Sequence, residues 1–188
     1  MTEAEIIERI LAGETQVFAV LVGQYQRKAL SLAERMMQDS EEARDLVQDA
    51  FVKAYRSLGS FKGDSTLSTW FYRIVYTTCL NALDKRKRTP VHDVIDEEMS
   101  PVWVNPRVFV DLDRKQIDEV LHEELRNMPS VYSTIMELFY IDDFSYDEIV
   151  NITGLPLGTV KTRLNRGRQQ LRAALLKRLP DAENLYET

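Results

Sequence analysis

The residues of this chain that could perform chemistry are few, and their spacing does not favour catalysis. Two acidic pairs, Asp142–Asp143 and Asp111–Asp113, carry the carboxylates that a magnesium-dependent nuclease would need. No supporting histidine, lysine or glycine-rich loop accompanies them, and the two histidines show no metal-ligand spacing. The single cysteine excludes a disulfide framework and a cysteine-based zinc site, and it fits a reducing compartment. We therefore expect no catalytic residue, no metal site and no cofactor.

Basic and amide side chains instead gather on one predicted helix near the C-terminal end. From Leu157 to Leu179 the chain has seven basic residues and no acidic residue. At 100° per residue, an apolar stripe turns inward and a polar face lies opposite. Arginine and lysine bind guanine edges or phosphates, and asparagine binds adenine edges, so this face is typical of a DNA-reading helix. The candidate DNA-binding residues are Thr159, Lys161, Thr162, Arg163, Asn165, Arg166 and Arg168.

The residues before this helix predict a helix-turn-helix. Ser145 and Glu148 have the spacing of a capping box, which begins a short helix. Gly154 tolerates the positive φ needed at the turn, and Pro156 suits the first turn of the next helix. The alternative is an ordinary helix pair with a solvated basic face. The run of unopposed basic residues favours DNA binding.

Two stretches of sequence resemble a known family. The run SYDEIVNITGLPLGTVKTRLNRGRQQL resembles region four of the extracytoplasmic-function (ECF) sigma factors of the sigma-70 family, which recognises the minus-thirty-five promoter element. It is also similar to LuxR-type response-regulator domains, so alone it leaves both interpretations open. The stretch ARDLVQDAFVKAYRSLGSF resembles region two of sigma factors, where this helix docks on the clamp helices of the polymerase beta-prime subunit. The candidate polymerase-binding residues on its outer face are Asp45, Gln48, Asp49, Val52 and Arg56.

The stretch that follows, FKGDSTLSTWFYRIVYTTCLNALDKRKR, is similar to the sigma segments that open and read the minus-ten element. Unpaired bases have free π faces and free pairing edges, which suit a surface of aromatic, hydrogen-bonding and cationic side chains. Aromatic residues are more often core than base platform, so Phe61 and Trp70 also have a purely structural interpretation. The candidate minus-ten residues are Phe61, Lys62, Ser65, Trp70, Arg73, Thr77, Asn81 and Arg88.

Apolar residues recur at three- and four-residue spacing, which predicts helices, and no run of useful length alternates between apolar and polar residues as a strand would. We therefore expect helices to position all of these residues. We expect an all-α chain of two small helical domains, a region 2 bundle over residues 1–88 and a region 4 helix-turn-helix over residues 115–179. Residues 89–114 contain three prolines and many acids, which predicts a flexible acidic linker, and residues 180–188 form a tail. The net charge of −6 hides this pattern, since residues 89–125 carry 3 basic and 10 acidic side chains, a net of −7.

The resemblance implies an alternative sigma factor that directs promoter recognition, melting and transcription initiation, and that is not an enzyme. The implied partners are core RNA polymerase, through the beta-prime clamp helices and the beta subunit, promoter DNA, and an anti-sigma factor. No window approaches a spanning helix and the acidic N-terminus is unlike a signal peptide, so we expect a cytoplasmic protein without direct membrane insertion. The alternatives are a LuxR-type regulator, which needs only the C-terminal half, and a sigma-like decoy that titrates an anti-sigma factor.

Overall fold

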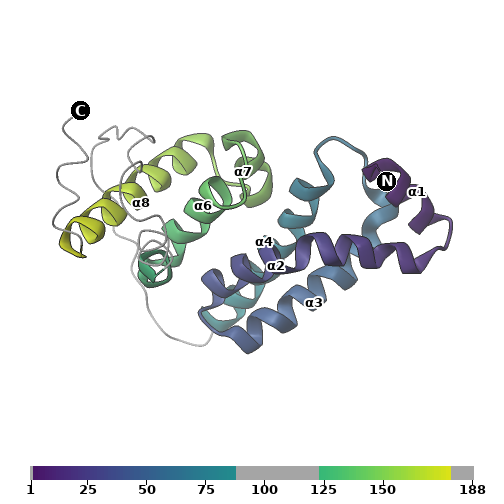
Figure 1. The fold of residues 1–188 in the computed structure, drawn as a ribbon, viewed down its shortest axis with the longest axis horizontal. Helices are drawn as coiled ribbons and strands as arrows, with labels where there is room; N and C mark the ends of the chain where they lie inside the picture. The colour runs from purple at the N-terminus through teal and green to yellow at the C-terminus, as the bar shows by residue number, and fades with distance from the viewer. Residues whose placement is uncertain (1, 88–122, 179–188) are drawn as a thin grey trace.

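The computed structural model describes residues 2–87 and 123–178, and within these ranges it contains helices and turns but no strand (Figure 1). This confirms the predicted all-α class. The first part contains α1 (Glu3–Leu11), α2 (Phe18–Met37), α3 (Ser40–Ser57) and α4 (Leu67–Lys87), with short 3-10 turns at Thr15–Val17 and Leu58–Ser60. In the second part, helical residues 123–127 precede α6 (Ser130–Tyr140), α7 (Tyr146–Thr153) and α8 (Leu157–Arg178).

Helices α2, α3 and α4 pack into a bundle whose centre is aromatic. The Phe71 ring lies 5.5 Å from that of Tyr25 and 4.6 Å from that of Phe51, measured between ring centroids. Asp39 begins α3 by accepting hydrogen bonds of 3.0 Å from the backbone N–H groups of Glu41 and Glu42. This bundle fixes the outer faces of α3 and α4, which carry the predicted polymerase-binding and minus-ten residues.

Local rules set the geometry of the helix-turn-helix. The Ser145 side chain accepts a hydrogen bond from the Glu148 backbone N–H, and the Glu148 carboxylate accepts one of 2.9 Å from the Ser145 N–H. This is the predicted capping box. Gly154 ends α7 with a φ of +72°, a conformation that glycine adopts without steric cost. Pro156 directly precedes the first residue of α8.

Helix α8 is 22 residues long and crosses α6 at Gly167. A Cβ atom on Gly167 would lie 2.8 Å from Cγ of Met136, so a residue without a side chain permits this close crossing. At the C-terminal end of α8, Arg178 donates hydrogen bonds of 2.7 and 3.2 Å to the two carboxylate oxygens of Glu123. The inward stripe is buried as predicted: Val160, Leu164 and Leu171.

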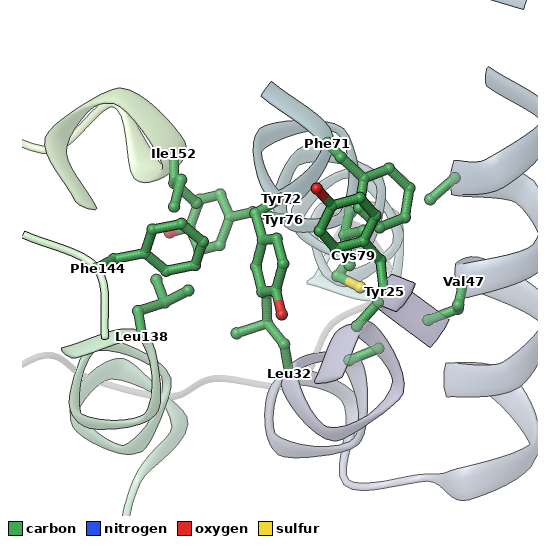
Figure 2. Packing of buried hydrophobic residues seen from close by; sticks show 14 of the residues in the cluster. Tyr25, Leu32, Val47, Phe71, Tyr72, Tyr76, Cys79, Leu138, Phe144 and Ile152 are labelled. Atoms are coloured by element: carbon green, nitrogen blue, oxygen red, sulfur yellow. The ribbon is translucent and has the colours of Figure 1, made fainter. Parts of the chain in front are cut away.

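The two parts share one apolar core, which the expectation of two flexibly tethered domains did not anticipate. Helix α6 packs against α2, and α7 packs against α4. Figure 2 shows Tyr72 of α4 turned away from its own bundle, toward Phe144 and Ile152. Helix α4 thus buries side chains on two faces. The predicted linker and tail lie outside the described residues, and the domain boundaries stay predictions.

Candidate nucleic-acid interface

The polar face predicted on α8 reaches solvent along its length. Lys161 and Thr162 are exposed, and the other five predicted residues are half-buried. Thr162 donates a hydrogen bond of 2.8 Å to the Gly158 carbonyl oxygen, which occupies its hydroxyl hydrogen. All seven predicted residues therefore reach solvent, and we call this set the α8 face: Thr159, Lys161, Thr162, Arg163, Asn165, Arg166 and Arg168.

An aromatic cluster holds two cations of the α8 face, and the sequence analysis missed it. Arg168 Nε donates a hydrogen bond of 2.5 Å to the Tyr140 hydroxyl, and its guanidinium carbon lies 5.9 Å from the centre of the Phe139 ring. The Phe139 and Tyr146 rings stack at 5.0 Å, and Lys161 Nζ lies 6.0 Å above Tyr146. Burial alone would lower the pKa of Arg168, but hydrogen bonds to Tyr146 and Tyr140 raise it. Both cations are thus held in defined positions at one edge of the face.

The second predicted surface combines the outer side of α4 with the loop before it, and we call it the α4 surface. Lys62, Arg73, Thr77 and Asn81 are exposed, while Phe61, Ser65 and Trp70 are half-buried. The Phe61 and Trp70 rings pack 5.3 Å apart between centroids, so they support each other and still reach solvent. The last predicted residue, Arg88, lies outside the described residues. Of the other seven, the structure brings Phe61 of the loop into contact with Trp70 of α4.

The third surface is on α3, and we call it the α3 patch. All five predicted residues are exposed: Asp45, Gln48, Asp49, Val52 and Arg56. Val52 is 42% exposed, and Tyr55 beside it is 40% exposed. Tyr55 was not predicted; its ring packs edge-on against Phe18 at 5.1 Å, so it is anchored as well as accessible. An anchored apolar surface rimmed by charges is suited to a protein partner.

The acidic pair Asp142–Asp143 is arranged for a structural contact rather than for an ion. The Asp142 side chain is 1% exposed, and its carboxylate lies 3.4 Å from Lys28 Nζ of α2. Asp143 is exposed and has a left-handed φ of 60°. Within residues 2–87 and 123–178, no group of three or more histidine, cysteine or acidic side chains could hold a metal ion. The other pair, Asp111–Asp113, lies outside these ranges.

None of the described helices is both long enough and apolar enough to cross a membrane.

The two buried tyrosines of α4, Tyr72 and Tyr76, lie where α4 meets the second part. Burial raises the pKa of the Tyr76 phenol, and the nearby Arg163 guanidinium lowers it in part. Arg163, from the α8 face, therefore lies close to α4.

Comparison with known proteins identifies the same two regions. The family model for Sigma-70 region 2 matches residues 21–89, and the model for Sigma-70 region 4 matches residues 118–171. The chain is 33% identical to the RNA polymerase sigma-H factor of Pseudomonas aeruginosa, over 96% of this chain and 97% of the relative. It is 34% identical to the ECF RNA polymerase sigma-E factor of Escherichia coli strain K12, over 91% and 93% of the two chains.

A solved structure has the same arrangement of helices. The sigma factor RpoE from Bartonella quintana, in its co-crystal structure with the anti-sigma factor NepR, superposes with a TM-score of 0.62 and 25% identity. The match covers 84% of this chain and 96% of the other. Both sigma-70 regions are matched, and the relatives align over nearly their whole length. The chain therefore belongs to the sigma-70 family and is an alternative sigma factor of the extracytoplasmic-function type.

Proposed function

We propose that this sigma factor uses three separate surfaces, one for polymerase and two for promoter DNA. The α3 patch docks on the beta-prime clamp helices of core RNA polymerase, and region 4 adds a contact with the beta subunit. The α4 surface binds the melted minus-ten strand. The α8 face enters the major groove of the minus-thirty-five duplex. Each surface has the chemistry that its partner requires.

The observation that carries the proposal is the unopposed charge of the α8 face. Among the described residues, Lys161, Arg163 and Arg166 form no ion pair with an acidic side chain. Their charges remain available for phosphates and guanine edges, whose contacts dominate the affinity and the specificity of protein–DNA complexes. A helix-turn-helix whose second helix presents such a face is the geometry of a major-groove reader.

The α4 surface suits single-stranded DNA for a different reason. Phe61 and Trp70 offer ring faces on which an unpaired base can stack, a contact worth roughly 1–3 kcal/mol per base. Arg73 adds a cation and Asn81 adds an amide that can pair with a base edge. Thr77 donates its hydroxyl hydrogen to the Arg73 carbonyl oxygen at 2.7 Å, so toward DNA its oxygen acts as an acceptor.

The chain contributes binding energy and performs no chemistry of its own, because the polymerase synthesises the RNA. We therefore infer that it is not an enzyme. Polymerase and chromosome share one compartment in bacteria, so we also infer that the protein works in the cytoplasm. A LuxR-type regulator would not need region 2, and a decoy would not need the basic α8 face. Neither alternative is favoured.

An anti-sigma factor is the remaining proposed partner. The Bartonella quintana relative was crystallised with its anti-sigma factor NepR. We propose that a protein of this class also binds this chain and withholds it from polymerase.

The assignment of the α8 face is tested by comparing two arginines of the same helix. Arg166 is half-buried and projects opposite the Val160 stripe, whereas Arg172 is exposed about 1.7 turns farther along. A bidentate arginine–guanine pair contributes roughly 1–3 kcal/mol of discrimination, and a phosphate contact weakens all sequences alike. We expect Arg166→Ala to relax the preference at one minus-thirty-five position. Arg172→Ala should lower affinity evenly and reduce the dependence on salt.

The measurement is selection of bound DNA sequences by polymerase carrying each variant, followed by titration at several salt concentrations. The two variants are matched controls, because both remove one arginine from α8. An unchanged consensus for Arg166→Ala would contradict its role in base reading. Loss of all DNA binding by both variants, with intact helices, would contradict the division between base and phosphate contacts.

A further inference from the structure

Helix α1 precedes the segment that matches region 2, and it lies against the loop that leads into α4. The family model begins at residue 21, whereas α1 spans Glu3–Leu11. Residues 58–66 join α3 to α4, and we call them the α4 loop; three residues of the α4 surface belong to it. Glu3 and Leu11 are eight residues apart, roughly 12 Å along the helix. One helix can therefore reach from one end of the loop to the other.

The contact with the end of the loop is made by Glu3. Its Oε2 atom accepts a hydrogen bond of 3.5 Å from the backbone N–H of Leu67, the first residue of α4. Its Oε1 atom accepts one of 3.5 Å from the hydroxyl of Tyr25 on α2. Burial raises the pKa of Tyr25 to about 12, and the Glu3 charge adds to the rise, so this phenol stays protonated and can donate. The Tyr25 hydroxyl thus helps to hold the carboxylate at the start of α4.

The first turn of α4 contains no acidic residue of its own. The Thr66 hydroxyl accepts a hydrogen bond of 3.2 Å from the Thr69 N–H, which satisfies one of the free N–H groups at this helix end. A negative charge beside the other N–H groups stabilises the start of a helix, because the partial positive charge of the helix dipole lies there. Glu3 supplies such a charge from a different helix.

The contact with the beginning of the loop is apolar. A Cβ atom on Gly59 would lie 3.6 Å from Cδ2 of Leu11, so the leucine side chain rests on the 3-10 turn Leu58–Ser60. Ile6 and Ile10 are buried and anchor the inner side of α1 in the core. These contacts fix α1 independently of Glu3, so the carboxylate is presented to α4 from an anchored helix.

The two rings proposed to stack on unpaired bases are attached to the two elements that α1 contacts. Phe61 directly follows the 3-10 turn, and its N–H donates a hydrogen bond of 3.0 Å to the Leu58 carbonyl oxygen. Trp70 is in the first turn of α4, and its N–H donates one of 3.1 Å to the Thr66 carbonyl oxygen. The rings meet at 5.3 Å between centroids. A shift of the start of α4 would therefore change how the two rings face each other.

We propose that Glu3 is a positioning residue for minus-ten recognition, whose carboxylate holds the first turn of α4 and thereby sets the place of Trp70 relative to Phe61. The inference rests on the proposed function of the α4 surface for its consequence, whereas the contact with Leu67 is a property of the chain alone. Glu3 acts through Leu67 and contacts no base. Helix α1 thus contributes to reading the minus-ten strand although none of its residues belongs to the α4 surface.

The first test measures amide hydrogen exchange at Leu67 in the full-length chain. Glu3→Ala removes the carboxylate, and because Glu3 is exposed the substitution leaves no cavity. Glu8→Ala is the matched control, since it removes the same charge from another exposed position of α1. We expect exchange at Leu67 to rise roughly threefold to fivefold in Glu3→Ala and to keep the parent rate in Glu8→Ala. Glu3→Gln, which keeps an acceptor oxygen without the charge, should give an intermediate rate.

Equal exchange rates at Leu67 in the parent and in Glu3→Ala would overturn the proposal. Circular dichroism should show the same helix content for all variants, so that a local change at α4 is distinguished from a loss of folding.

The second test uses polymerase reconstituted with each variant and the single-stranded minus-ten sequence that the parent holoenzyme selects from a randomised pool. Glu3→Ala should weaken binding of this strand at least about twofold and leave the affinity for core polymerase unchanged. In a Phe61→Ala background, Glu3→Ala should cause less than half of that loss, because a ring that has been removed cannot be misplaced. Full additivity of the two substitutions, or an equal loss of polymerase affinity, would overturn the positioning role.

The two tests separate this inference from the proposed function. If the parent holoenzyme selects no sequence from the pool, the proposed function of the α4 surface fails. The exchange rates at Leu67 then decide by themselves whether Glu3 holds the start of α4.

Discussion

The buried ion pair between Arg35 and Glu137 yields the sharpest prediction of stability. Arg35 is on α2 and Glu137 is on α6, so the pair joins the two regions. Their side chains are 7% and 1% exposed. Replacing Arg35 by methionine keeps an unbranched side chain of similar length and removes the charge. It leaves the Glu137 carboxylate buried without its partner.

The size of the effect follows from this burial. Breaking a buried ion pair by removing one partner costs roughly 3–5 kcal/mol, because the remaining charge is not compensated. Both side chains are more than nine-tenths buried, so solvent screening reduces this value little. Replacing both charges, as Arg35→Met with Glu137→Leu, should cost only about 1 kcal/mol or less, since well-packed apolar side chains substitute for such pairs. The coupling energy in a double-mutant cycle is then at least about 2 kcal/mol.

The assay is urea unfolding of the full chain, combined with the distance between nitroxide labels on cysteines introduced at Arg44 of α3 and Asn151 of α7, both exposed. The two groups belong to different regions, so the single variant can relieve its penalty by separating α6 from α2 and admitting water to Glu137. We therefore expect Arg35→Met to open the chain at lower urea than it unfolds the helices. The double variant should close again. Single losses that simply add in the double variant, or a loss below about 0.5 kcal/mol for Arg35→Met, would refute the reasoning.

Two further predictions concern the α4 surface and pH. Arg73→Ala should reduce open-complex formation while leaving binding to core polymerase intact, as measured by permanganate footprinting and by polymerase affinity; equal loss of both would mean that Arg73 is structural. Burial raises the pKa of Asp142 above its ordinary value of 3.8, with Asp143 adding to the rise, while Lys28 and Tyr72 oppose it. The folded chain therefore holds a proton that the unfolded chain releases, so folding is favoured at low pH and this advantage is lost as pH rises through the raised pKa of Asp142. The free energy of unfolding of the parent should fall as pH rises through that pKa, and Asp142→Asn should not show that change.

Features governed by neighbouring residues were predictable from the sequence. The capping box of Ser145 and Glu148, the left-handed turn at Gly154 and the buried stripe of α8 depend on spacings of a few residues. The exposed sides of α3 and α4 followed from helical periodicity in the same way. These rules place a residue on a face of its own helix, and the predicted site residues were chosen by face.

What the sequence did not reveal is which faces meet between distant helices. In the sequence, nothing sets Tyr72 apart from the other aromatic residues of α4. In the structure it packs on Phe144, 72 positions later in the chain. Asp142 was considered as a magnesium ligand, but the structure shows it buried against Lys28. Periodicity predicts that a side chain is buried and does not specify the partner. A contact made of tyrosines and ion pairs has the amino-acid composition of an ordinary exposed surface. The sequence alone therefore does not distinguish such a contact from a surface.

The glycine in the middle of α8 has a mechanical consequence. Gly167 lets α8 rest directly on Met136, and Arg178 fixes the far end of the helix to Glu123. The helix can therefore tilt about this crossing point, and a tilt displaces the N-terminal turns of α8, which we propose to read DNA. Lys161 is six residues from Gly167, roughly 9 Å along the helix, so a tilt of roughly 5° about this point moves it by roughly 0.8 Å. Hydrogen bonds to bases tolerate only about 0.5 Å, so under the proposed function the depth at which α8 rests on α6 sets how accurately the helix meets the groove.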